Sequence, residues 1–242
     1  MKNIFILICL ITIFFQLPAY SQNDKSNEDW ANLKKYSEAD KILTRQAPGE
    51  NRIVFMGNSI TEFWAKIDTA FFANKTYIDR GISGQTSPQM LLRFRQDVIN
   101  LKPAIVIILA GTNDIAENTG PISLEDILGN IISMAQLAEA NKIKVIISSV
   151  LPAYDFPWHP GLQPAEKIVK LNSMIKSYCK ENNIVYVDYY SSMVDDRKGL
   201  DNKYTNDGVH PTLAGYKIMD GLIERAINKV LETTKSNNRN NM

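Results

Sequence analysis

The feature that most limits the possible folds of this chain is the uninterrupted apolar run Ala104-Ile-Val-Ile-Ile-Leu-Ala110. A strand that is apolar at every position is buried on both faces of its sheet, which is typical of parallel sheets. Further segments of strand length lie at residues 53–56, 76–79, 144–150 and 184–187. Because helical patterns separate these segments, the sequence predicts repeated βαβ units and an α/β fold.

The segments between the predicted strands show apolar residues at helical spacing. An irregular helix is expected over residues 60–72, and Pro88 begins a second one. Ser123, followed by Asp126 three residues later, predicts a capped helix N-terminus. Pro211 is expected in the first turn of the last helix, where its fixed φ is compatible with the helix.

We expect a single three-layer α/β/α domain over residues 51–231, because no internal repeat or shift in composition divides it. Its five-stranded parallel sheet is assigned the flavodoxin-like order 2-1-3-4-5, one of two common orders for this pattern. Residues 22–50 are expected to contain a lead-in helix, from about 28 to 46, with Trp30, Leu33 and Leu43 roughly on one face. Residues 232–242 form a polar tail that is expected to fray.

The N-terminus has the pattern of a signal peptide over residues 1–21. Lys2 precedes an apolar run from Ile4 to Phe15, and Ala19-Tyr-Ser21 supplies small residues for cleavage. The alternative is a membrane anchor, but this run is too short to cross a bilayer. We therefore expect an exported protein, either periplasmic or secreted, with no integral membrane segment after processing.

Charge and cysteine content exclude several classes of partner. Without Lys2, the chain has 26 basic and 26 acidic residues. This balance argues against nucleic acid or an anionic membrane as a partner bound by bulk electrostatics. Outside the leader only Cys179 remains, so no internal disulfide can form. With two histidines and no second cysteine, a transition-metal site is not expected.

Ser59 directly follows the first predicted strand, in Gly57-Asn-Ser-Ile60. In open α/β sheets, ligands bind at the carboxyl ends of the strands, so this hydroxyl is a candidate nucleophile. The structural alternative is an ordinary strand-to-helix turn in which Ser59 caps the following helix.

Three other stretches carry polar groups that the apolar strands do not explain. Residues 81–87 follow the second strand, and Asn113 follows the third. If the first strand lies between these two, all three strand ends border one crevice. Asp207 lies three residues before His210, so its carboxylate can hold the imidazole with one nitrogen facing a hydroxyl. A turn that caps the last helix is the alternative for this stretch.

Together the four stretches resemble the blocks of the SGNH/GDSL hydrolase family, in the family's order and over about residues 53–227. Gly57-Asn-Ser-Ile60 is similar to the nucleophile block, although Asn58 replaces an aspartate of the name-giving motif. The other three are similar to the glycine, asparagine and acid–base blocks: Gly81-Ile-Ser-Gly84, Gly111-Thr-Asn-Asp114 and Asp207-Gly-Val-His210.

The resemblance implies a serine esterase that needs no cofactor. Ser59 would attack the ester carbonyl, His210 would accept its proton, and Asp207 would orient the imidazole. The backbone N–H groups of Ser59 and Gly84 and the side-chain amide of Asn113 would bind the oxyanion.

Three other classes fit the sequence less well. An α/β-hydrolase would show Gly-x-Ser-x-Gly, but Thr61 occupies the last position. A flavodoxin-like phosphate or nucleotide module would have a glycine-rich loop of standard spacing, which is absent. A non-catalytic carbohydrate-binding protein would not need a serine, an aspartate and a histidine together.

The expected substrate is a small-molecule or glycan ester, with a carbohydrate O-acetyl ester as first choice. A lysophospholipid, another lipid acyl ester or a thioester is the alternative, although no lid segment is evident for a long acyl chain. Trp64, Tyr154 and Trp158 can stack on a sugar or grip an acyl chain, or simply pack in the core or a loop. His159 either lines the pocket mouth or lies on a surface loop.

Overall fold

The computed structural model describes residues 29–43, 51–73 and 76–240. The predicted signal peptide, residues 1–21, lies outside these ranges, as do residues 241–242 of the predicted tail. The sheet is entirely parallel and has the order β2-β1-β3-β4-β5, which confirms the predicted α/β fold and strand order. Its strands are β1 (Ile53–Gly57), β2 (Tyr77–Gly81), β3 (Ile105–Ile108), β4 (Lys144–Ser148) and β5 (Val185–Val187).

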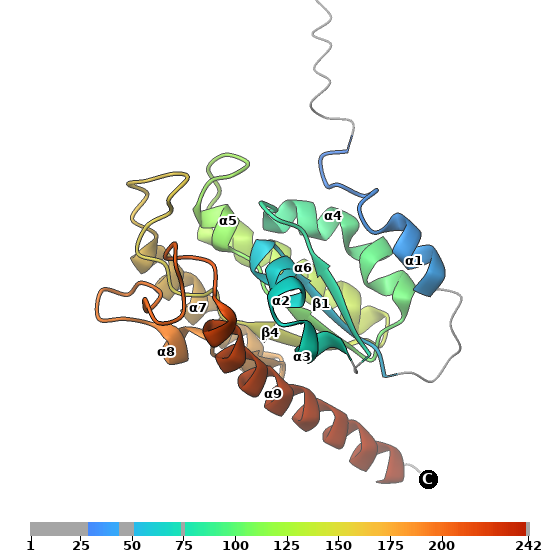
Figure 1. Cartoon of the computed structure of the whole chain (residues 1–242). Coiled ribbons are helices and arrows are strands. Elements are labelled where there is room, and N and C mark those ends of the chain that lie inside the picture. Colours follow the sequence, from blue (N-terminus) through green and yellow to red (C-terminus); the bar gives the residue numbers. More distant parts are fainter. Residues whose placement is uncertain (1–28, 44–50, 74–75, 241–242) are drawn as a thin grey trace, which may run out of the picture.

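Each face of the sheet is covered by its own layer of helices (Figure 1). Successive side chains of a strand point to opposite faces. Val54 and Met56 therefore join one apolar core, whereas Ile53 and Phe55 join the other. The first core lies under α4 (Ser87–Asp97), α6 (Leu124–Ala140) and α7 (Pro164–Glu181). The second lies under α2 (Ser59–Ile67), α3 (Thr69–Ala73) and α9 (Leu213–Asn240).

Shorter elements complete the fold. They are α1 (Ser37–Leu43), a 3₁₀ turn at Ile99–Leu101, α5 (Thr112–Ile115) and α8 (Tyr190–Met193). The predicted cap of α6 is confirmed, because the Ser123 hydroxyl accepts the backbone N–H of Asp126 at 3.0 Å. Pro211 lies two residues before α9 rather than in its first turn.

The predicted lead-in helix is wrong over residues 29–36, and its predicted ends at residues 28 and 44–46 lie outside the described ranges. Helix begins only at Ser37, and the residues before it form turns in which Trp30 and Leu33 are exposed. The Asp29 carboxylate accepts the backbone N–H groups of Leu33 and Lys34, which satisfies them outside a helix. Asn32 has a φ of +52°, a left-handed conformation that interrupts helical geometry.

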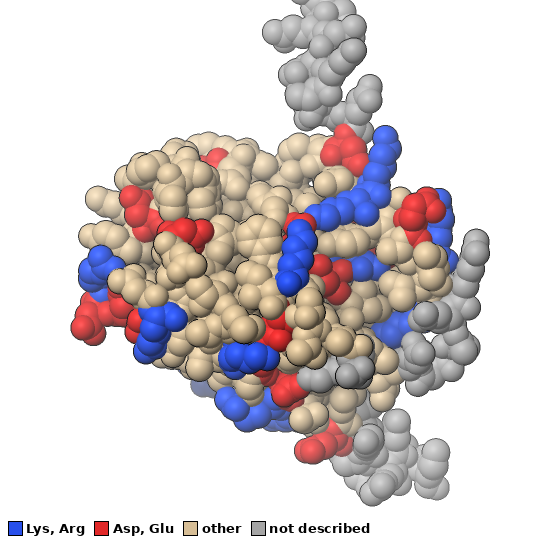
Figure 2. Space-filling view, viewed as in Figure 1, with Lys and Arg blue, Asp and Glu red and all other residues tan. Residues whose placement is uncertain are grey.

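The C-terminal segment also differs from its prediction. Helix α9 continues to Asn240 through most of the predicted frayed tail, and it extends beyond the sheet (Figure 1). Over the described ranges, none of the helices combines the length and apolarity needed to cross a membrane. Figure 2 shows basic and acidic side chains interspersed over the face in view, in keeping with the balanced charge.

Candidate active site

The nucleophile block places Ser59 at the first position of α2, immediately after β1. The cap of this helix is Asn58, whose side-chain oxygen accepts the backbone N–H of Ile60 at 3.0 Å. The interpretation of Ser59 as the helix cap is therefore wrong, and Asn58 makes the bond expected of the aspartate that it replaces. The Ser59 hydroxyl instead lies 2.9 Å from Nε2 of His210.

The stretch from Asp207 to His210 forms both the predicted turn and the predicted contact. Oδ1 of Asp207 accepts the backbone N–H groups of Val209 and His210, at 2.9 and 2.8 Å. Oδ2 lies 2.7 Å from Nδ1 of His210. Thr205, which the sequence analysis missed, donates its hydroxyl to the His210 carbonyl at 2.8 Å. One carboxylate therefore fixes both the backbone position and the ring orientation of His210.

Hydrogen-bond chemistry decides which imidazole nitrogen carries the proton. Burial alone would raise the pKa of Asp207, but the bonds from the ring and backbone of His210 outweigh it and lower this pKa to about 2. An ionised carboxylate only accepts, so Nδ1 of His210 must be the donor. In the neutral imidazole Nε2 is then the acceptor, and it faces the Ser59 hydroxyl.

The glycine block lies against the helix that carries Ser59. A side chain at Gly81 would place Cβ 2.2 Å from the backbone nitrogen of Glu62, so only glycine allows this contact. Ser83 donates its backbone N–H and its hydroxyl to one oxygen of Glu62, both at 2.7 Å. Gly84 then adopts a φ of +79°, which favours glycine.

Two asparagines hold the carbonyl groups of this loop from the other side. Nδ2 of Asn113 in α5 donates to the Gln85 carbonyl at 2.9 Å, and that of Asn118 donates to the Gly84 carbonyl at 3.1 Å. A primary amide carries two N–H donors, and the bond to Gln85 uses one of those on Asn113. Asn113 is predicted from the sequence, whereas Glu62 and Asn118 are not, because no local pattern indicates a contact with a distant loop.

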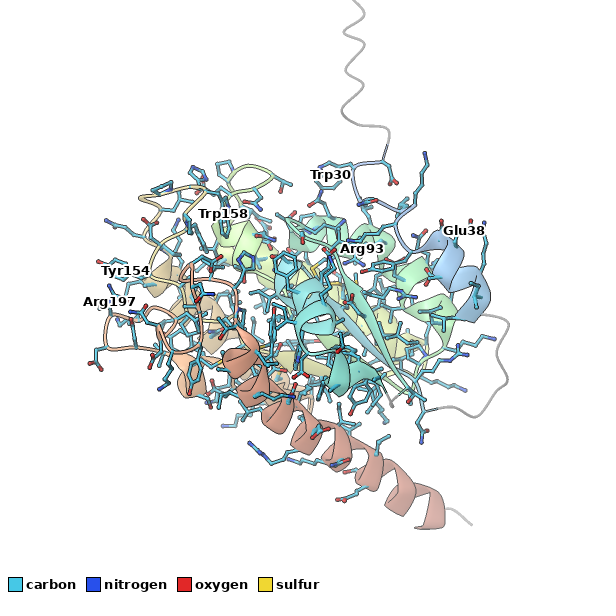
Figure 3. The ribbon with its side chains drawn as sticks, viewed as in Figure 1. Trp30, Glu38, Arg93, Tyr154, Trp158 and Arg197 are labelled. Atoms are coloured by element: carbon cyan, nitrogen blue, oxygen red, sulfur yellow. The ribbon has the colours of Figure 1, made fainter. Side chains whose placement is uncertain are left out.

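Two aromatic rings adjoin the imidazole of His210. The ring of Phe63 lies 5.3 Å from it and that of Trp158 lies 6.1 Å from it, centroid to centroid. Trp158 is 44% exposed, and its indole N–H donates to Oδ1 of Asn118 at 2.9 Å. Figure 3 shows Trp158 at the upper left of the molecule, with Tyr154 below it and beside Arg197.

Tyr154 lies on the same loop as Trp158 and precedes it in the chain. Its side chain is 57% exposed, and the guanidinium of Arg197 lies 5.3 Å from the centre of its ring. Both residues line a pocket of about 210 Å³ that also reaches Asp207 and Gly208. Tyr154 therefore borders a hollow next to the acid–base block but makes no described contact with Ser59 or His210.

Trp64 is not a substrate contact, which corrects the expectation from the sequence. Its side chain is only 1% exposed and stacks against Phe71 and Tyr216, with ring centroids 5.2 and 5.7 Å away. Its indole N–H donates to Oδ1 of Asp220 at 2.9 Å. The reason is helical spacing: Trp64 lies four residues after the buried Ile60 and so shares the inward face of α2.

His159 lies on a surface loop, which was one of the two positions predicted for it; the other was the mouth of the pocket. Its Nδ1 lies 2.9 Å from the carbonyl of Ala116, which ties this loop to the segment after α5. In the part of the chain that the structure describes, no three His, Cys, Asp or Glu side chains gather closely enough to bind a metal ion.

A parallel α/β sheet that presents serine, histidine and aspartate in series at its carboxyl end has the arrangement of serine hydrolases. The sequence profile of the GDSL-like Lipase/Acylhydrolase family matches residues 55–218. The chain therefore belongs to this family, as its motifs predicted, and is a carboxylic ester hydrolase.

Proteins from several bacteria are similar to this chain. The structure of a proposed acylhydrolase from Bacteroides fragilis is 53% identical, with a TM-score of 0.82 over 84% of this chain and 99% of the other. A GDSL-like lipase from Bacteroides thetaiotaomicron is 55% identical, with a TM-score of 0.80 over 82% and 98% of the two chains. Esterase TesA of Pseudomonas aeruginosa is 26% identical over 72% of this chain and 85% of its own length.

Proposed function

We propose that this protein is an exported serine esterase that removes small acyl groups, above all acetyl groups, from carbohydrates. The observation that carries the catalytic part is the series of contacts from Ser59 through His210 to Asp207, at 2.9 and 2.7 Å. Export rests on the signal-peptide pattern of residues 1–21.

In the first half of the reaction, the Ser59 oxygen attacks the ester carbonyl and its proton moves to Nε2 of His210. Asp207 stabilises the imidazolium that forms, because its carboxylate is ionised and bonded to Nδ1. The imidazolium returns the proton to the departing alcohol, which leaves an acyl group on Ser59. Water, activated by the same imidazole, then releases the acid.

The tetrahedral oxyanion would be bound by the backbone N–H groups of Ser59 and Gly84 and by the amide of Asn113. The N–H of Ser59 is in the first turn of α2, where backbone donors have no partner within the helix. These amides do not titrate near neutral pH, so they can bind negative charge over the whole working range. Such donors contribute most when their direction is set before the charge develops.

The surroundings of His210 favour a carbohydrate as the alcohol half of the ester. The exposed indole of Trp158 is held in one orientation by Asn118 and offers a face on which a sugar ring can stack. Tyr154 offers a second exposed ring beside the pocket of about 210 Å³ near Asp207.

The catalytic part is tested by hydrolysis of p-nitrophenyl acetate, with Ser59→Ala as the control. We expect Ser59→Ala to abolish turnover, and equal rates for the two proteins would overturn the proposal.

The substrate is tested with p-nitrophenyl esters of increasing acyl length, followed by acetylated oligosaccharides. We expect acetyl esters to be the best of the series, and a preference for octanoyl or longer chains would favour a lipid substrate instead. Trp158→Ala should raise KM for an acetylated oligosaccharide by about tenfold, the loss of one stacking contact of about 1.4 kcal/mol. Trp158→Phe, which keeps a ring, serves as the matched variant, and p-nitrophenyl acetate as the substrate without a sugar.

A further inference from the structure

A segment outside the family-matched residues 55–218 contacts the glycine block. Residues 29–36, which we name the N-terminal strap, run along α4 before α1 begins (Figure 1). We propose that this strap is a positioning element for the oxyanion donors, and that Lys35 and Tyr36 are its positioning residues. The inference deepens the proposed function and rests on it.

Three glutamines hold the backbone of the strap in place. Gln85 of the glycine loop donates to the Ala31 carbonyl at 2.6 Å. From α4, Gln89 donates to the Trp30 carbonyl at 2.7 Å and Gln96 to that of Leu33 at 2.5 Å. Figure 3 shows Trp30 at the start of this segment. Because side chains bind three carbonyls of one irregular segment, its path is fixed by the domain rather than by helical propensity.

The strap in turn contacts the glycine loop directly at Gly81 and indirectly through Glu62 of α2. The Tyr36 hydroxyl donates to the Gly81 carbonyl at 2.5 Å, and the Tyr36 ring lies over the guanidinium of Arg80. The ammonium group of Lys35 lies 2.8 Å from Oε1 of Glu62. The other oxygen of Glu62 accepts both donors of Ser83, so Lys35 braces the carboxylate that holds this residue.

Glu62 links the loop to the nucleophile, because it lies three residues after Ser59 on α2. The N–H of Gly84 belongs to the peptide group that starts at the Ser83 carbonyl, so fixing Ser83 limits the direction of that donor. Gly84 has little packing of its own, since no atom lies within 4 Å of the position that a Cβ would occupy. Its alignment with Ser59 therefore depends on the anchors around it, and Glu62 is the anchor that the strap supports.

The chain offers a matched pair of lysines for the test. Lys66 also contacts Oε1 of Glu62, at 2.7 Å, but it belongs to α2 itself and its side chain is 62% exposed, against 27% for Lys35. Lys35→Met and Lys66→Met thus remove the same charge from the same carboxylate, and only the first removes a contact that the strap makes. We expect Lys35→Met to lower kcat on p-nitrophenyl acetate by about tenfold. This is less than the roughly 10²-fold loss of rate that a misplacement of about 1 Å can cause. KM should stay unchanged, and Lys66→Met should stay within about twofold of wild type in kcat.

Tyr36→Phe is the second variant, because it removes the short bond to the Gly81 carbonyl and a longer one to Asp79 but keeps the ring over Arg80. It should lower kcat in the same direction, and Lys35→Arg should restore most of the activity lost in Lys35→Met. Phenylboronic acid is the probe of alignment, since it binds a serine hydroxyl as a tetrahedral anion. We expect its affinity to fall by the same factor as kcat in Lys35→Met.

The labelling stoichiometry of Ser59 with a fluorophosphonate separates this role from a general loss of folding. The proposal would be overturned if both strap variants keep the wild-type kcat per labelled Ser59 and the wild-type affinity for phenylboronic acid. This holds even if fewer sites are labelled. An equal loss in Lys66→Met would overturn it too, because the charge alone would then be responsible. If wild-type protein neither turns over ester nor labels at Ser59, the proposed function itself fails, and the role of the strap with it.

Discussion

Replacement of Asn113 by alanine separates two roles that the structure gives to one amide. Its Nδ2 donates to the carbonyl of Gln85, and its second N–H is the proposed donor to the oxyanion. The side chain is buried in α5, so no other residue or bulk solvent can take its place easily. Asn113→Ala therefore removes an anchor of the glycine loop and a group that stabilises the transition state.

The two losses have different magnitudes and different readouts. Loss of one oxyanion donor lowers turnover by about 10²–10³, or about 3–4 kcal/mol. Loss of the bond to the buried Gln85 carbonyl destabilises the fold by about 2 kcal/mol. For a domain of this size, that corresponds to a decrease of roughly 4–8 °C in Tm.

The assay is kcat on p-nitrophenyl acetate at saturating substrate, corrected for the labelled fraction of Ser59, together with a thermal melt. Asn118→Ala is the matched control, since it deletes an amide bonded to the adjacent Gly84 carbonyl but no proposed oxyanion donor. We expect that control to lose less than about tenfold in kcat, as an anchor rather than a donor. Equal losses in the two variants, or a loss below tenfold in Asn113→Ala, would exclude Asn113 as an oxyanion donor.

Three further predictions concern stability. Asn58→Ala should lower the free energy of unfolding by about 1 kcal/mol, because the cap of α2 is lost, whereas Asn58→Asp should keep both the cap and the activity. Trp64→Phe should lower it by about 2–4 kcal/mol, through a cavity and the loss of the indole bond to Oδ1 of Asp220, with kcat per folded molecule unchanged; an effect on KM would restore Trp64 as a substrate contact. Burial opposes ionisation of Glu62, but its bonds to Lys35, Lys66 and Ser83 lower its pKa from 4.5 to about 2. Its contribution is complete above pH 4.5 and is lost as the pH falls towards 2, so Tm should depend less on pH in this window for Glu62→Gln than for wild type.

Much of the architecture was readable because it depends on local patterns. The apolar run ending at Ala110 marks a strand buried on both faces, and the interleaved helical patterns leave a parallel sheet as the natural arrangement. Asp207 and His210 were readable for a similar reason, since three residues in a turn bring the carboxylate to the ring without help from the rest of the fold. The strand order, by contrast, was a choice between two common topologies, and the observed sheet resolves it.

The chemical groups of the site can be read from the chain alone: a serine, a glycine loop and an asparagine follow predicted strands, and an acid–base pair precedes the last helix. The tertiary fold sets what surrounds them. It buried Trp64, left Trp158 exposed beside His210, and brought Lys35 and Glu62 to the glycine loop. These contacts join residues that are far apart in the chain. No local propensity encodes such pairs, because packing of whole elements determines which side chains meet.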